Sequence, residues 1–463
     1  MKTIKLVTTG LLSMLAINVA SALTEIRLTG STAFRNATDN AIRDTLQTGY
    51  VWGSTGGAGI GANQEIFVGL TNTSNVQVEI KCSWSGSAGG IQTVASVSPS
   101  LAAGQPFIID ATGVSFSGAN ATATVDATPL TAAGANILST DITESAHADV
   151  ALSDAYQSTT PYVAGTYLGV TYANLADTIV GVVPFEWVKG ATTVSVGGVA
   201  GVTNVAIPQA QALLTGGIAM NQFTGNIGDQ GVIVGTVGRD HDSGTRIGAF
   251  YDGQIGGLVF GSPTDAFLTP CLQYIPNGAV VGANQFDPQS PGTGTISTLT
   301  AWPTESVLGE TRPSGNEGFF SGSNVKAVLN RPTDLTQGNY IISYLGMSDA
   351  NGVNPGTGYS YTDGAGHTAT VTPSQNALTF GGYYPGTPTH PFGPPYTNIL
   401  QGIYTFWGYE HYLYNSSTIG AKKSVADQIA AQVTLEADYN GVGIKLSDMV
   451  SSRTGDGLSV TSP

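Results

Sequence analysis

Charged residues are scarce in this chain, and basic residues are the scarcer kind. Only 10% of the 463 residues are charged, and 16 lysines and arginines stand against 31 aspartates and glutamates, for a formal net charge of −15. General binding to nucleic acid requires clustered positive charge, so this composition argues against a nucleic-acid partner. A local anion site held by helix dipoles and one arginine is still compatible with an acidic surface.

Cysteine is almost absent. The two cysteines, Cys82 and Cys271, are too few for a disulfide scaffold. A single bridge would be compatible with an oxidising compartment. We expect two buried free thiols instead, because the two residues fall in different lobes of the fold that the motifs below indicate.

Signals for metal binding and covalent catalysis are also missing. The sequence has neither a Gly-x-Ser-x-Gly elbow nor a lysine-bearing P-loop. The five histidines show no metal-ligand spacing; they are His147, His241, His367, His390 and His411. We therefore expect no metal, no cofactor and no enzyme activity.

The long apolar run is confined to the N-terminus. Lys2 and Lys5 precede a largely apolar stretch at 6–19, and Ala20-Ser21-Ala22 matches a small-residue cleavage site. The stretch is shorter than the roughly 20 residues that span a bilayer. We predict a signal peptide over 1–22 and a soluble protein exported to the periplasm or the cell exterior. No cysteine stands at the cleavage site, so no lipid anchor is expected there.

Glycine and apolar residues are plentiful by contrast. With 62 glycines and 41% hydrophobic residues, the chain has a globular composition and length for two or three domains. One stretch combines several anion-binding features. An apolar run at 232–237 leads into the turn 238–246, which carries Arg239, Ser243, Thr245 and Arg246 before a predicted helix. Free N–H groups at a helix start, with hydroxyls and guanidinium groups, favour an oxyanion.

Similar units occur earlier in the chain. A predicted strand at 26–28 is followed by the turn 29–34 and a helix over 35–46, and a strand at 76–80 by the turn 85–90 and a short helix at 91–94. The strand at 148–154 ends on Ser153 and Asp154. Strands that alternate with helices predict an α/β fold with a largely parallel sheet, and ligands bind beyond the carboxyl ends of such strands.

The remaining segments are less distinctive. We expect short strands in an insertion at 95–145, a buried strand or crossover at 178–188, helices at 209–220, 323–329 and 424–435, a turn at 221–227, a strand at 339–345, a loop-rich passage at 351–395, and an aromatic core and hinge segment at 396–414.

The order of these motifs resembles that of the phosphate-binding proteins of ABC transporters, within the periplasmic substrate-binding protein superfamily. The resemblance covers about 26–435 and rests on Thr29–Phe34, Gly86–Ile91, Leu152–Ala155, Gly181–Val183, Phe223–Ile227, Arg239–Thr245, Gly315–Gly318 and Ile341–Tyr344. It implies a two-lobe, type II-like periplasmic binding protein fold of α/β class, with β-rich insertions and a ligand cleft between the lobes. Lobe I would comprise 23–183 and 396–463, and lobe II 184–395.

The same resemblance implies a monomeric receptor that hands inorganic phosphate, or a similar oxyanion, to an ABC permease in the membrane. The phosphate-binding residues that it implies are Thr32, Ala33, Phe34, Ser87, Asp154, Arg239, Ser243, Gly244 and Thr245. An ionised Asp154 can only accept hydrogen bonds. It would favour hydrogen phosphate over sulfate, because sulfate carries no proton to donate.

This sequence departs from the family pattern at three places. His241 stands where a carboxylate partner of Arg239 is usual, Ala33 stands where a hydroxyl is usual, and the 95–145 insertion separates Ser87 from Asp154. These departures keep two alternatives open: the same fold binding another oxyanion or a phosphorylated compound, and a surface or structural protein without transport function. Ser243 could also be an ordinary helix cap, and Asp154 an ordinary turn residue.

Overall fold

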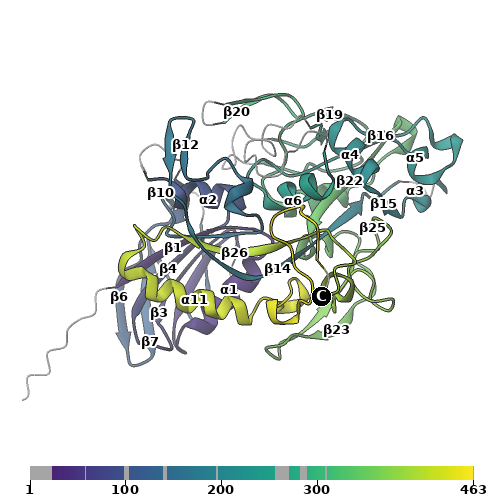
Figure 1. Cartoon of the computed structure of the whole chain (residues 1–463). Coiled ribbons are helices and arrows are strands. Elements are labelled where there is room, and N and C mark those ends of the chain that lie inside the picture. The colour runs from purple at the N-terminus through teal and green to yellow at the C-terminus, as the bar shows by residue number, and fades with distance from the viewer. Residues whose placement is uncertain are drawn as a thin grey trace, which may run out of the picture.

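The computed structural model describes residues 23–57, 59–97, 104–138, 143–193, 197–255, 271–281, 289–307 and 310–461. The predicted signal peptide lies outside these residues. A 13-stranded mixed sheet runs through the molecule in the order β16-β17-β22-β14-β26-β11-β1-β4-β3-β2-β9, with β25 and β15 joined beside β14. Helices pack around this sheet in two halves (Figure 1). The predicted α/β class with two lobes is confirmed, but the sheet is mixed and not largely parallel as predicted, because long antiparallel strands join its halves.

The first half contains the parallel strands that the sequence predicts before the glycine-rich turns. β1 (Thr24–Gly30) pairs in parallel with both β4 (Gln77–Ser83) and β11 (Val150–Ser153). The outer strands are β3 (Gln64–Leu70), β2 (Val51–Thr55) and β9 (Ala135–Ile137). The helices of this half are α1 (Arg35–Thr45), α2 (Ser87–Ala95) and α11 (Lys423–Leu435), and α11 packs against α1.

Two long antiparallel strands join the halves. β14 (Ala176–Lys189) pairs with β26 (Trp407–Tyr414) along its first part and with β22 (Asn339–Gly346) along its second. Its continuous apolar sequence follows from burial on both faces. Phe185 and Phe406 pack at this junction with ring centroids 5.3 Å apart. The aromatic segment therefore packs in the core, as predicted, and its role as a hinge stays a prediction.

The second half is built on β22 and β17 (Ile233–Thr236), which are parallel, with β16 (Ile218–Ala219), β25 (Ala377–Phe380) and β15 (Asn204–Val205). Its helices are α3 (Gly197–Gly201), α4 (Ile207–Thr215), α5 (Asn221–Thr224), α6 (Gly244–Asp252), α8 (Gly322–Leu329) and α9 (Met347–Ala350). The short α10 (Thr397–Leu400) precedes β26.

Small sheets decorate this frame. The insertion after α2 forms β5 (Gln105–Ile108) with β10 (Thr143–Ala146), and the meander β6 (Thr112–Ser117), β7 (Asn120–Val125) and β8 (Thr128–Pro129). The other hairpins are β12 (Gly165–Tyr167) with β13 (Val170–Tyr172), β18 (Tyr274–Pro276) with β19 (Leu299–Ala301), β20 (Glu305–Val307) with β21 (Glu310–Arg312), and β23 (Tyr359–Thr362) with β24 (Thr368–Val371).

Several local predictions need correction. The helix predicted over 209–220 ends at Thr215, because Gly216 and Gly217 follow. The predicted turn at 221–227 begins with α5, and the passage at 351–395 contains β23, β24 and β25. The lobe boundaries stay a prediction, since the one between 183 and 184 falls inside β14.

Two further observations concern covalent and membrane features. Cys82 and Cys271 are both free and buried, which confirms the expected thiols. Among the described residues, none of the helices has the length and apolar character needed to cross a membrane.

Candidate functional site

The predicted turns meet because three parallel strands end side by side. In the register of the sheet, Gly30 of β1 lies opposite Leu152 of β11. The backbone N–H of Ser31 donates to the Leu152 carbonyl at 2.8 Å, and that of Gly86 donates to the Gly30 carbonyl at 2.9 Å. Gly30 has a φ of 117°, and a Cβ there would lie 1.9 Å from the Leu152 oxygen. Glycine is required at this close approach.

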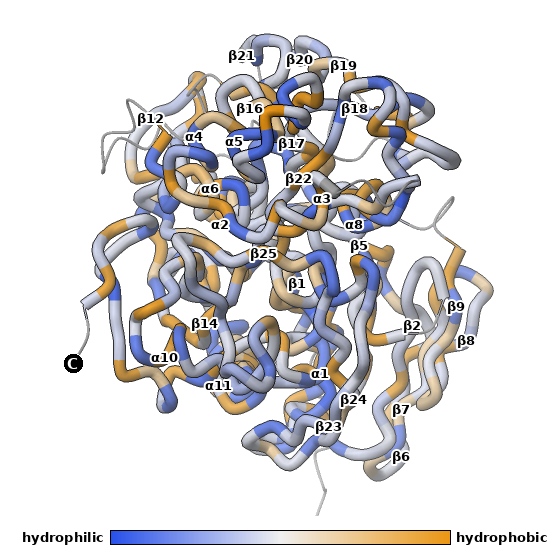
Figure 2. The backbone as a smooth tube through the Cα atoms, turned by 90° about the vertical axis from the view of Figure 1, so that its right-hand side faces the viewer, coloured by the Kyte–Doolittle hydropathy of each residue, from blue (hydrophilic) through white to orange (hydrophobic). Residues whose placement is uncertain are grey.

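The second half meets this edge through the start of α6. Ala88 N–H, at the start of α2, donates to the Asp242 carbonyl at 2.9 Å. The Asp154 carboxylate accepts from the Ser87 hydroxyl on one oxygen and from the Thr245 hydroxyl, at 3.1 Å, on the other. Figures 1 and 2 both place α2 beside α6. Asp154 thus lies between two helix N-termini, one from each half of the molecule.

Gly244 is the residue that permits this approach. A Cβ at position 244 would lie 1.9 Å from Asp154 Oδ1 and 2.8 Å from Ser87 Oγ. Asp154 is 2% exposed. Burial raises the pKa of its carboxyl group, while hydrogen bonds from Ser87 and Thr245 and the charge of Arg239 lower it. Ser87, Asp154, Gly244 and Thr245 therefore form one cluster, which we call the Asp154 cluster.

The other predicted residues have different surroundings. The Ser243 hydroxyl accepts from the Arg246 N–H at 3.2 Å, so Ser243 is the N-cap of α6. Phe34 is fully buried, and its ring packs against Gly181 in the core of the first half. Ala33 faces Gly346 of the second half, and Thr32 is half-buried beside it. Within the turn 31–34, the backbone rather than these side chains is suited to hold an anion.

Arg239 and Arg246 take separate roles. The Arg239 guanidinium donates to the carbonyls of Phe319 and Phe320, at 3.1 and 2.8 Å, and its charge acts on Asp154. These two bonds use two of its five N–H donors. Arg246 is 1% exposed and donates to the Arg239 carbonyl and to Asn316. The sequence predicts that Arg246 donates hydrogen bonds to an anion, but its guanidinium group instead donates to the turn and stabilises it.

His241 pairs with Glu317 instead of Arg239. Its Nδ1 lies 3.0 Å from Glu317 Oε2, and its Nε2 lies 3.4 Å from Asp242 Oδ1. Burial lowers the pKa of His241, but the charges of Asp242 and Glu317 outweigh burial and raise it. Arg312 also lies 3.0 Å from Glu317. The sequence showed that Arg239 lacks the usual carboxylate partner at position 241. It did not predict that Glu317 pairs with His241, because Glu317 lies 76 residues away in the chain.

Acid should weaken this ion-pair network. Burial would raise the pKa of Glu317, yet His241, Arg246 and Arg312 lower it from 4.5 to about 2. Such a group adds stability above its unfolded pKa, and that stability is lost as the pH falls toward 2. We expect Glu317→Gln to lose roughly 3 kcal/mol at pH 7 and to flatten the decline of stability between about pH 5 and pH 2.

Denaturant unfolding of both proteins across this pH range measures the effect. The difference between the two proteins reports on Glu317 together with its charge effect on Asp240, whose buried carboxyl has a pKa raised to about 8, mainly by burial, and titrates in the opposite sense. Equal stabilities at pH 7, with parallel declines in acid, would show that Glu317 contributes no such stability.

Arg35 was missed by the sequence argument. It opens α1 directly after the turn 31–34, and its Nη1 donates to Asn63 Oδ1 at 2.7 Å. Burial lowers the pKa of Arg35, Asp349 raises it, and the positive charge of Arg239 lowers it further. Two guanidinium groups from opposite halves therefore act on each other. A basic residue at a helix N-terminus is unfavourable next to the positive end of the helix dipole. This unfavourable position is the sequence feature that could have identified Arg35 as a candidate site residue.

One group in the described part of the chain has donor atoms for a metal: Asp44, His367 and Glu436, whose ligand atoms lie within 4.8 Å of one another. His367 Nδ1 lies 3.1 Å from Asp363 and 3.4 Å from Glu436, and Glu436 also accepts from Asn40. We interpret this group as a hydrogen-bonded ion-pair network.

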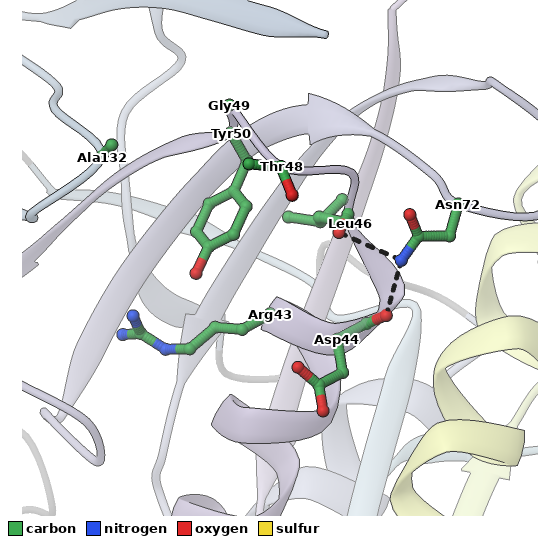
Figure 3. A pocket seen from close by; sticks show the side chains of 8 residues that line it. All are labelled: Arg43, Asp44, Leu46, Thr48, Gly49, Tyr50, Asn72 and Ala132. Carbon is green, nitrogen blue, oxygen red and sulfur yellow. Dashed lines mark hydrogen bonds between the residues drawn. The ribbon is translucent and has the colours of Figure 1, made fainter.

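A separate surface pocket lies at the other end of α1, away from the Asp154 cluster. Figure 3 shows Arg43, Asp44 and Tyr50 lining it, and Asn72 donates to the carbonyls of Asp44 and Leu46 at its edge. The Arg43 guanidinium lies 3.8 Å above the Trp52 ring. None of the predicted ligand-binding residues lines this pocket.

Comparison with known proteins finds distant structural alignments. No family model and no curated protein matches the sequence. A solved structure from Clostridium perfringens, described as a phosphate ABC transporter substrate-binding protein with bound phosphate, aligns over 91% of this chain and 100% of its own, at 11% identity and a TM-score of 0.40. An ABC-type phosphate transport receptor from Vibrio cholerae aligns over 90% and 99%, at 13% identity and a TM-score of 0.37. The site stands on the geometry above alone.

Proposed function

We propose that the protein is an exported solute-binding protein that captures a tetrahedral oxyanion, hydrogen phosphate first, between its two halves for delivery to an ABC permease. One observation carries the proposal: the two halves meet at the Asp154 cluster, where two helix N-termini and two hydroxyls surround one buried carboxylate. Donors contributed by both halves couple ligand binding to their closure. Helix N-termini and hydroxyls are also the groups that hold oxyanions.

Asp154 sets the preference for a protonated ligand. Burial raises the pKa of Asp154, and the hydroxyls of Ser87 and Thr245 and the charge of Arg239 offset part of that rise by favouring its ionised form. An ionised carboxylate accepts a hydrogen bond from hydrogen phosphate, whereas sulfate at neutral pH has no proton to give. A buried carboxylate facing sulfate is left unpaired and repelled.

Thermal unfolding in the presence of single anions tests the proposal. A ligand that binds the folded protein raises its midpoint, so we expect phosphate to raise it and sulfate or chloride at equal ionic strength to leave it unchanged. A screen in which every oxyanion gives the same midpoint as chloride would contradict an oxyanion-binding function.

Arg35 favours a second candidate, a phosphorylated organic compound. The charge of Arg239 acts on Arg35, which comes from the opposite half, and two cations suit a ligand larger than one phosphate group. Under this candidate, glycerol phosphate raises the unfolding midpoint more than inorganic phosphate at the same concentration. The reverse order excludes the larger ligand.

A further inference from the structure

Glu410 is a buried acidic residue outside the Asp154 cluster. It lies in β26 opposite Gly181 of β14 and is 0% exposed. Neither of its carboxyl oxygens has a hydrogen-bond partner among the residues that the structure describes. Buried polar groups are nearly always paired, so the position of this carboxyl group relative to the Asp154 cluster becomes important.

The register of the sheet directs Glu410 toward the Asp154 cluster. β11 and β26 are antiparallel, and their last pair is Ser153 with His411. Asp154 follows directly after that pair, so continuing the register brings it toward Glu410. Side chains of directly opposed residues lie on the same face of a sheet. Gly408, two residues before Glu410 and so on the same face, would place a Cβ 2.7 Å from the Asp154 carbonyl oxygen.

The groups that interact with Glu410 are consistent with a side chain that faces the Asp154 cluster. Asp154 and Ser31 are the two groups whose interactions act on its ionisation. The Ser31 hydroxyl is itself buried, at 1% exposed, and lacks a hydrogen bond of ordinary geometry among the described residues. Glu410 and Ser31 therefore interact with each other near the end of β11, where the turns of the first half converge.

The surroundings of Glu410 favour its protonated form. Burial raises the pKa of its carboxyl group well above the usual range, the negative charge of Asp154 raises it further, and Ser31 offsets only part of the shift. Of the titratable groups, Asp154 is the one that acts on it. A protonated carboxyl group can donate a hydrogen bond, which an ionised one cannot.

We propose that Glu410 is a further ligand-binding residue, whose protonated carboxyl group donates to an unprotonated oxygen of the bound oxyanion while Asp154 accepts from its protonated oxygen. This inference rests on the proposed function. It narrows the ligand class to oxyanions that present both kinds of oxygen at neutral pH, such as hydrogen phosphate and hydrogen arsenate. It also makes the affinity decline in alkali, because an ionised Glu410 loses its donor and repels the ligand.

Calorimetric titration with inorganic phosphate between about pH 7 and pH 9.5 tests this role. Glutamine keeps a donor and cannot ionise, so we expect Glu410→Gln to bind within about threefold of the wild type at pH 7 and to abolish the alkaline decline. Glu410→Ala loses the donor and should bind about tenfold more weakly at pH 7.

Glu186 offers a matched control. It lies in β14, is 0% exposed, has two carboxyl oxygens without partners in the described residues, and responds to burial alone. Glu186→Gln should leave both the affinity and its pH profile unchanged. A wild type that binds no phosphate contradicts the proposed function itself. A wild type that binds, with a Glu410→Gln variant showing the same alkaline decline, overturns only the role of Glu410, and this comparison holds even where Glu410→Ala fails to fold.

Discussion

Replacing Arg239 with alanine is expected to weaken phosphate binding by about a hundredfold or more, the worth of a charge-assisted, two-point contact. Arg239 is 3% exposed, and the carbonyls of Phe319 and Phe320 hold its guanidinium group in place. Its charge already acts on Asp154. Without it, an anion would enter a buried site next to a carboxylate and lose the positive charge that Arg239 places beside Asp154.

Arg331 supplies the control for this experiment. It is 6% exposed and likewise donates to carbonyls, those of Gly294, Pro291 and Asn277. Arg331→Ala should lower the unfolding midpoint through lost hydrogen bonds but leave phosphate affinity unchanged. If Arg239→Ala and Arg331→Ala bind phosphate equally well, Arg239 does not contact the ligand.

Replacing Asp154 with asparagine is expected to reduce the preference for phosphate over sulfate by at least about tenfold. Asparagine has nearly the same shape and keeps an oxygen that can accept from Ser87 or Thr245. It removes the negative charge that repels sulfate and adds an N–H donor that an unprotonated oxygen can accept. Affinity for sulfate should therefore rise relative to that for phosphate, as measured by paired titrations.

Asp252 tests whether any buried carboxylate would have this effect. It ends α6 and lies 3.4 Å from Arg453, and burial raises its pKa to about 6. Asp252→Asn should leave the phosphate-to-sulfate ratio as in the wild type. An Asp154→Asn variant with an unchanged ratio would mean that another group selects the ligand.

The strands, turns and helices that carry the site could be predicted from the sequence more accurately than the side-chain contacts within it. The runs before Ser31, Ser87, Asp154 and Arg239 follow strand patterns, and glycine-hydroxyl turns mark where strands give way to helices. Parallel pairing then brings such turns to one edge, which is a general property of these sheets. The meeting of Ser87 and Asp154 could be predicted for this reason. Thr245 follows β17, which pairs with β22 in the other half, so its place beside them was implied only by the family resemblance.

Contacts made across long stretches of chain could not be predicted. The Ser243 hydroxyl has two plausible uses in sequence, and the structure uses it as the helix cap. The carbonyls that hold Arg239 come from residues 80 and 81 positions away. Glu410 lies within an aromatic strand whose composition indicates only core, and its position near Asp154 depends on the pairing of β26 with β11.

Calorimetric titration of the purified protein with phosphate, followed by sulfate, tests the central claim most directly. We expect saturable binding of one phosphate per chain at micromolar protein concentration. Sulfate at the same pH and ionic strength should give little or no heat. A folded protein that gives no phosphate heat, or that binds sulfate as tightly as phosphate, would contradict the claim.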